Sequence, residues 1–183
     1  SVSIPELADS TVFLAYHLGD KQYITDTLSL DPNGSGHFAG DEELPQGIYM
    51  IVLPGKQYFE MLLSDDQYFS VSCSYPDYYN TLKFNGSDEN TAFVAYQKHW
   101  VELQRKASSI NRRAQNNRQN PDSLKILTEM HKKQEELMKD YLKGVISDNK
   151  GTLLSVLVKA MLPVDPPQIT VPSGTRNPDS VRW

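Results

Sequence analysis

The sequence predicts an α+β protein, in which an N-terminal antiparallel β-sandwich is followed by a C-terminal helical hairpin and a short third helix. Up to about residue 86, apolar residues alternate in short runs separated by turn residues, as in half-buried strands. From there to residue 162 they recur every three or four positions, as on the buried face of a helix. We therefore expect a β-sandwich domain over residues 1–86, a helical segment over 87–162 and a proline-rich linker or tail over 163–183.

The N-terminal segment is predicted to form short strands joined by turns. Residues 11–18 are rich in β-forming side chains and end at Gly19-Asp20, and residues 22–30 alternate with a period of two. Residues 31–36, DPNGSG, supply the proline, asparagine and glycines of a turn. Because no long helix separates the runs, an antiparallel sandwich or barrel is expected, not a parallel sheet. The remaining strands are expected at residues 37–40, 47–54, 58–64, 68–74 and 81–84.

A long helix is predicted to begin at Ser87. This residue is a favourable N-cap, and Asp88 and Glu89 place negative charge in the first turn, near the positive end of the helix dipole. The apolar side chains that follow are spaced by three or four residues, so they form a stripe that needs a partner surface. The stripe consists of Phe93, Tyr96, Trp100, Leu103, Ala107 and Ile110.

Two further helices are expected. Residues 116–123, NNRQNPDS, interrupt the pattern, and Pro121 with Asp122 or Ser123 starts a second helix that closes at Gly144 or a few residues later. A third helix over roughly 151–162 stops at Pro163, because proline cannot continue a helix. The first two helices should form an antiparallel hairpin, and the third is apolar enough to be largely covered.

Composition and charge describe a globular chain with an uneven surface. Hydrophobic residues make up 39% and charged residues 22%, which excludes a disordered protein. The net charge of −5 combines a balance of −11 over residues 1–90 with +6 over residues 91–183. Such a division arises when the two halves attract each other, when each faces a different partner, or when strand and helix surfaces simply differ in composition.

Neither a transmembrane helix nor a leader is expected from the sequence. The longest apolar stretch, residues 153–162, is broken by Ser155 and Lys159 and is too short to cross a bilayer. The chain begins at Ser1 without an initiator methionine or an apolar leader, so we expect a processed protein or a fragment.

The residues that usually carry catalysis or hold cofactors are sparse. Cys73 is the single cysteine and is expected to pack inside a strand region. The histidines, His17, His37, His99 and His131, show no metal-ligand spacing. The signatures GxSxG, HExxH, CxxC and GxxxxGK do not occur in the sequence. No catalytic residue, cofactor or metal is therefore expected.

A calcium loop is the strongest alternative to that expectation. Asp31, Asn33, Ser35, Gly36 and Glu42 match the spacing of an EF-hand loop, in which oxygen ligands alternate and a closing glutamate binds bidentately. An EF-hand needs a helix on each side, and the flanks here alternate with a period of two. A wide β-hairpin explains the same residues without a metal.

Tyrosines and arginines form the two candidate binding surfaces. Tyr75, Tyr78 and Tyr79 are expected in one loop, where aromatic rings could stack on a sugar or anchor a protein, or simply pack against the sandwich. Arg105, Arg112 and Arg113, with Lys106 and Arg118, lie in a stretch without acidic residues. No stacking aromatic residue lies among these cations, so a contact with the acidic half or with an anionic partner is expected and nucleic-acid binding is not.

The order of three segments is similar to a known protein family over roughly residues 11 to 165. The segments are residues 19–72, residues 82–97 (LKFNGSDENTAFVAYQ) and residues 153–161 (LLSVLVKAM), which precede a proline-rich stretch. The chain resembles the N-terminal region of Bacteroidetes envelope proteins of the thioredoxin-like, thiol–disulfide oxidoreductase family. In that family a β-sandwich module of unknown function and a helical segment precede a thioredoxin-like domain. The matching residues are turn and strand residues, so no active-site residue carries over.

The resemblance implies an exported protein, in the periplasm or attached to the outer membrane, that contacts the membrane only through a removed or lipidated leader. It implies a non-catalytic support or interaction module, which positions or dimerises a downstream thioredoxin-like domain or binds another envelope protein. The alternative is a sandwich that binds a glycan or a peptide through the Tyr75–Tyr79 loop or a sheet edge.

Overall fold

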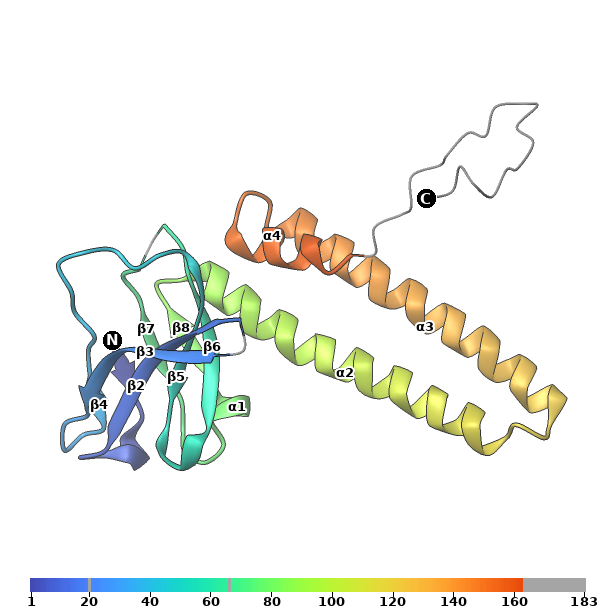
Figure 1. The fold of residues 1–183 in the computed structure, drawn as a ribbon, viewed down its shortest axis with the longest axis horizontal. Helices are drawn as coiled ribbons and strands as arrows, with labels where there is room; N and C mark the ends of the chain where they lie inside the picture. Colours follow the sequence, from blue (N-terminus) through green and yellow to red (C-terminus); the bar gives the residue numbers. More distant parts are fainter. Residues whose placement is uncertain (20, 66, 163–183) are drawn as a thin grey trace.

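A computed structural model describes residues 1–19, 21–65 and 67–162. It confirms the α+β class: two four-stranded sheets form the N-terminal half and long helices form the C-terminal half. Figure 1 shows two antiparallel helices that extend away from the sandwich like an arm, with a shorter helix beside them. The expected tail at 163–183 lies outside the described residues.

The first sheet has the strand order β3-β2-β5-β6 and is antiparallel throughout. It consists of β2 (Thr11–Leu18), β3 (Lys21–Ser29), β5 (Gly47–Val52) and β6 (Tyr58–Leu63). β3 carries a bulge where the register shifts between Leu14 and Ala15 of β2. The strands predicted at 11–18, 22–30, 47–54 and 58–64 are confirmed to within a few residues.

The second sheet has the order β4-β1-β7-β8 and is built from very short strands. They are β1 (Val2–Ser3), β4 (Ser35–Gly36), β7 (Ser70–Ser72) and β8 (Lys83–Asn85). β1 pairs antiparallel with β4 and parallel with β7, so this sheet is mixed. A two-residue strand such as β1 leaves no alternating pattern in the sequence, and it was not predicted. Two 3₁₀ turns, Pro5–Leu7 and Pro54–Lys56, complete this half.

Three strand predictions need correction. The strand expected at 37–40 is absent, because the two residues of β1 pair with Ser35 and Gly36 and leave nothing to pair with the residues that follow. The strand expected at 68–74 is confined to β7. The strand expected at 81–84 begins later, because Thr81 ends an unpredicted short helix, α1 (Tyr78–Thr81), where its hydroxyl donates to Asp77 O and accepts from Ser74 N.

The core of the sandwich lies between the two sheets. Inward-facing residues alternate along β2 and β5, and these strands supply Val12, Leu14 and Ile51, which are buried. The loops contribute as well: Ile4 is fully buried beside the Pro5–Leu7 turn. The other buried members of this core are Val2, Leu7, Leu30, Tyr49, Leu53, Phe59, Met61, Leu63, Val71, Cys73 and Leu82.

The arm consists of α2 (Asp88–Asn116) and α3 (Pro121–Asp148), which run antiparallel (Figure 1). Ser87 caps α2, with its hydroxyl accepting from Asn90 N at 3.2 Å, and Asn120 caps α3 by accepting from Ser123 N at 3.0 Å. The helical hairpin, its break near 116–120 and the N-cap at Ser87 are confirmed. Members of the predicted stripe are buried or half-buried along α2.

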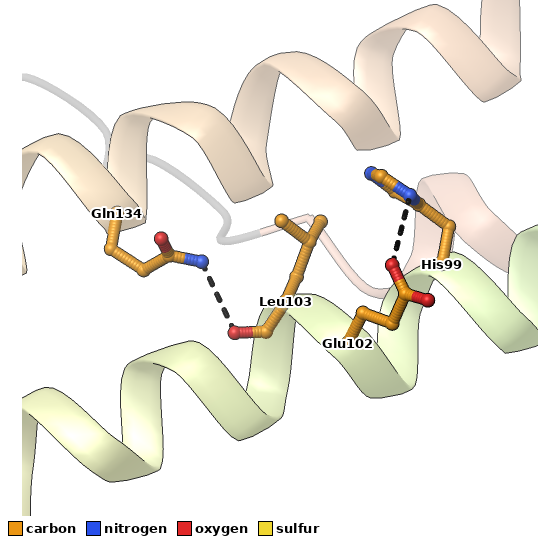
Figure 2. A network of polar contacts seen from close by, with 4 residues as sticks. All are labelled: His99, Glu102, Leu103 and Gln134. Carbon is orange, nitrogen blue, oxygen red and sulfur yellow. Dashed lines mark hydrogen bonds and ion pairs between the residues drawn. The ribbon is translucent and has the colours of Figure 1, made fainter.

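A buried amide marks the middle of the arm. Gln134 of α3 is buried, and its Nε2 donates to Leu103 O of α2 at 3.1 Å (Figure 2). A polar group placed in an otherwise apolar helix–helix seam favours one register over its neighbours, because a shifted register would leave the amide unpaired. Gln134 therefore helps to fix how α3 lies along α2.

The third helix, α4 (Leu153–Ala160), closes the arm next to the sandwich. A side chain of α2 caps the first turn of α4: Glu89 Oε1 accepts a hydrogen bond from Leu154 N at 2.8 Å. Tyr96 of α2 donates its hydroxyl to Met161 Sδ at 3.0 Å. Leu154 and Val158 are fully buried in a second core, as predicted for an apolar third helix. The second core consists of Leu62, Phe93, Tyr96, Leu142, Val145, Leu154 and Val158.

Leu62 of β6 joins the sandwich to the arm through both of its backbone polar groups. Its N–H donates to Asn90 Oδ1 at 2.7 Å, and its carbonyl accepts from Asn90 Nδ2 at 2.9 Å. The amide of Asn90 thus pairs with this edge strand as a neighbouring strand would, while the Leu62 side chain is buried in the second core. Two helical turns further along α2, Gln97 Nε2 donates a hydrogen bond to Glu60 Oε2 of β6 at 2.8 Å.

Candidate functional site

The structure places the predicted tyrosines on and beside α1, against the sandwich. Tyr75 and Tyr78 are half-buried and pack against the sandwich core, and the Tyr78 ring lies 6.5 Å from the Phe59 ring. Tyr79 is 44% exposed, with Lys98 Nζ of α2 lying 5.8 Å from its ring centroid. The segment therefore presents one exposed ring beside a cation, where three stacking rings were considered.

The predicted arginines lie on the half of α2 that extends away from the sandwich. Arg105, Arg112 and Arg113 are all exposed. Arg105 and Arg112 are seven residues apart and so share a helix face. The structure does not bring them together with the tyrosines, which lie at the other end of α2 (Figure 1). The two predicted surfaces are separate.

Cys73 is buried in the sandwich core, as expected. Burial raises the pKa of its thiol from 9.0 to about 11, and the negative charge of Glu6 contributes in the same direction. A thiol with so high a pKa is almost entirely protonated at neutral pH, and the thiolate is the reactive form. The environment of Cys73 therefore works against a nucleophilic or redox role.

We predict that Cys73 reacts poorly with a thiol reagent until the protein unfolds. At pH 8 a pKa of about 11 leaves roughly one thiolate in a thousand, so labelling with Ellman's reagent should be at least about 100-fold slower in buffer than in 8 M urea. The pKa of the Cys73 thiol is higher in the folded protein than in the unfolded chain. The contribution of this thiol to the free energy of unfolding is therefore fully present below pH 9 and declines as the pH rises to 11. Equal labelling rates in buffer and urea would contradict the burial of Cys73.

The possible calcium loop is part of a β-turn. Asp31 Oδ1 accepts hydrogen bonds from Asn33 N at 2.8 Å and Ser35 N at 2.9 Å, which is the geometry of an Asx turn. β3 precedes the loop and β4 lies within it, so the helices of an EF-hand are not found there. Across the residues that the structure describes, no three His, Cys, Asp or Glu side chains are grouped as metal ligands.

The histidines lie apart from one another. His99 Nδ1 lies 4.0 Å from Glu102 Oε2 within α2 (Figure 2), and His131 Nδ1 lies 3.5 Å from Glu135 Oε1 within α3. Both pairs are solvent-exposed, and such pairs contribute little to stability. His17 and His37 are exposed on β2 and on the loop after β4.

A large cavity opens at one end of the sandwich, and the sequence did not predict it. Its volume is about 1,100 Å³. Leu14, Met61 and Leu63 line it from one sheet and Val71 lines it from the other, while residues 37–44 form its outer wall. This wall is the segment where a strand was expected. The loop leaves the sheet after β4, and the core residues of the lining are at most 5% exposed, so the cavity lies over the packed core.

Hydrogen bonds to Gln67 hold one end of the cavity wall. Gln67 accepts a hydrogen bond from Leu44 N at 3.1 Å and donates one to Leu44 O at 2.7 Å. Phe38 and Leu44 pack against the sandwich core. A cavity with an apolar interior and a loop as its wall is the usual form of a ligand site.

Asn90 also has a structural role that was not predicted from the sequence. Only 1% of its surface is exposed, and it joins the arm to the sandwich. One signal was present in the sequence: Asn90 precedes Phe93 by three residues, so it lies in phase with the apolar stripe. A polar residue in phase with a buried stripe indicates a buried hydrogen bond.

Comparisons with known protein families, curated proteins and solved structures find no match for this chain. Among the helices of residues 1–19, 21–65 and 67–162, none combines the length and the apolarity that a membrane span requires.

Proposed function

We propose that this chain is a non-catalytic N-terminal support and interaction module of an exported thioredoxin-like protein of the thiol–disulfide oxidoreductase family. In this proposal the arm positions the thioredoxin-like domain that the sequence resemblance places downstream, or brings two such domains together as a homodimer. The protein would lie in the periplasm or at the outer membrane, as the same resemblance implies. The sandwich would serve as the base from which the arm projects.

The observation that carries the proposal is an apolar stripe on the outer surface of α3. Ile126, Met130 and Leu137 are spaced by four and seven residues, so they lie on one face of the helix. Ile126 and Leu137 are 59% and 50% exposed, although a helix that faces only water would carry polar side chains there. We call these three residues the arm stripe. Large apolar side chains that share an exposed helix face mark a contact surface.

The length of the chain after α4 would allow a downstream domain to contact the arm stripe. The described chain ends at α4, where Val156 and Met161 are also exposed apolar residues. Residues 163–183 could span at most ~70 Å if extended, whereas α3 is ~42 Å long, so a following domain could reach any part of the arm. A tethered domain is present at a high effective concentration, so even a weak apolar contact would hold it there.

The proposal predicts that polar substitutions in the arm stripe release the downstream domain. In the full-length protein, the triple variant Ile126→Ser, Met130→Ser, Leu137→Ser should raise the radius of gyration measured by small-angle X-ray scattering, because the apolar contact is lost. If the contact instead forms between two copies, light scattering should show a dimer that becomes monomeric. Circular dichroism should confirm that the helices remain.

A matched control uses exposed polar residues of the same helix. The triple variant Lys132→Ser, Glu136→Ser, Lys139→Ser changes the same number of side chains on α3 and should leave the radius of gyration and the mass unchanged. Wild-type values for both in the arm-stripe variant would remove the proposal. A reading frame that lacks a thioredoxin-like domain would remove its downstream partner.

The peptide-binding alternative is favoured by a separate observation, the cavity of about 1,100 Å³ in the sandwich. Glycan binding was expected through the Tyr75–Tyr79 loop or a sheet edge, and of the three tyrosines of that loop Tyr79 alone is classed as exposed. It remains a prediction, and glycan binding by the Tyr78→Ala, Tyr79→Ala variant would test it.

A further inference from the structure

The cavity in the sandwich combines an apolar interior with an acidic rim. Its floor includes Leu14, Met61 and Val71, which belong to the packed core and are at most 5% exposed. Four carboxylates stand among its lining residues: Asp26 on β3, and Asp41, Glu42 and Glu43 on the outer wall. Such a site is complementary to a molecule that carries both apolar groups and positive charge.

The carboxylates of the rim outnumber its cations, although the α-ammonium of Ser1, which donates to Phe69 O at 2.8 Å, also lines the cavity. Neither lysine nor arginine occurs among the described residues that line the cavity. Within the described part of the chain, the ion pairs within 4.0 Å all lie on α2 and α3, so none neutralises Asp41, Glu42 or Glu43. These three side chains are exposed, adjacent in sequence and alike in charge. Placing them together is unfavourable in isolation, and a bound cation would relieve that repulsion.

The position of the cavity favours a peptide over a compact small molecule. Its volume of about 1,100 Å³ is close to the upper end of the ~300–1,000 Å³ range of ligand pockets. It also reaches Thr25 and Asp26 of β3, an edge strand that pairs with β2 alone among the described strands. An extended peptide can add hydrogen bonds along such an edge while its side chains enter a neighbouring pocket.

We propose that the sandwich cavity binds an extended, basic peptide segment of a partner protein. Apolar side chains of the peptide lie between the outer wall and the apolar floor, and its lysine or arginine side chains lie against Asp26, Asp41, Glu42 and Glu43. Gln67 holds the outer wall at Leu44. This inference is independent of the arm stripe, which lies on a different element and carries different chemistry.

The test uses the full chain with ¹³C-labelled methionine methyl groups. Met61 lines the cavity, whereas Met130 is on α3, so the two methyl signals report on the two surfaces separately. The probe is a fluorescein-labelled peptide of alternating lysine and phenylalanine, and its counterpart replaces each lysine by glutamate. The basic peptide should shift the Met61 signal and leave Met130 in place, and the acidic peptide should shift neither.

Charge variants then locate the basic side chains. The rim variant Asp41→Asn, Glu42→Gln, Glu43→Gln should weaken binding of the basic peptide about tenfold in fluorescence anisotropy at low salt. The control variant Glu129→Gln, Glu136→Gln, Asp140→Asn makes the same change in net charge on α3 and should alter the affinity less than about twofold. Gln67→Ala, which frees Leu44, should change the dissociation rate of the peptide.

Several outcomes would overturn the proposal. Equal binding of the acidic and basic peptides would show that the rim does not select charge. Shifts at Met130 without shifts at Met61 would place the peptide on the arm. An alkylammonium surfactant that shifts Met61 when the peptide does not would make the cavity a site for a lipid-like amine. Equal weakening by the rim and control variants would reduce the effect to net charge alone.

Discussion

Asn90→Ala is expected to lower the free energy of unfolding by about 3 kcal/mol, because it leaves two buried backbone groups of Leu62 without partners. In the wild type these groups bond to the Asn90 amide at 2.7 and 2.9 Å. β6 is an edge strand, so no neighbouring strand can replace the lost bonds. Urea unfolding followed by circular dichroism measures the change.

Two further variants separate the hydrogen bonds from general effects on α2. Asn90→Asp keeps the shape but replaces the donor to Leu62 O by a carboxylate oxygen, so it should also destabilise clearly. Asn111→Ala changes an exposed asparagine of the same helix and should shift the free energy of unfolding by less than about 0.5 kcal/mol. If Asn90→Ala behaved like Asn111→Ala, the described joint between sandwich and arm would be wrong.

Leu154→Ala is expected to cost about 2–5 kcal/mol, the range for removing a large side chain from a packed core. Leu154 is fully buried in the second core, where α4 meets α2 and α3. Truncation leaves a cavity between three helices that are held in place by their caps and by Gln134, so the surroundings can collapse only in part. The same unfolding measurement applies.

Val156 provides the control for Leu154, because it lies on the same helix and is 62% exposed. Val156→Ala should change the free energy of unfolding by less than about 0.5 kcal/mol. Similar losses for the two variants would mean that α4 does not pack with the face that the structure shows. A loss at Leu154 alone supports α4 as an integral part of the arm.

The class and order of the elements could be predicted because burial imposes a period on the sequence. The stripe from Phe93 to Ile110 has the spacing of a helix face, and residues 22–30 have the alternation of a half-buried strand. The residues at the helix starts were predictable as well, because they favour helix N-termini: Ser87 caps α2, and Pro121 begins α3. These features depend on near neighbours in the chain.

What could not be predicted depends on residues that are distant in sequence. The two residues of β1 carry no period, and their pairing with β4 and β7 decides where the neighbouring strands stop. The cavity follows from that pairing, because residues 37–44 leave the sheet and become a wall. Asn90 and Leu62 are 28 residues apart, and a helix propensity says nothing about such a bond.

Of the two candidate surfaces, the exposure of the arginines could be predicted from the sequence and the packing of the tyrosines could not. Exposure of Arg105, Arg112 and Arg113 follows from their place opposite the apolar stripe of α2 and could be expected from the sequence. The packing of Tyr75 and Tyr78 could not, because it depends on α1, a single helical turn held by Thr81 and Asp77. Aromatic residues near turn signals are compatible with both packing and exposure.

We propose that the arm stripe contacts a thioredoxin-like domain located downstream in the full-length protein. The most direct measurement compares the methionine methyl spectrum of the full-length protein with that of residues 1–183. We expect the Met130 signal of the arm stripe to move when the proposed downstream domain is present, while the signal of Met50, fully buried in the sandwich, stays in place. Identical Met130 and Met161 signals in the two proteins would contradict it.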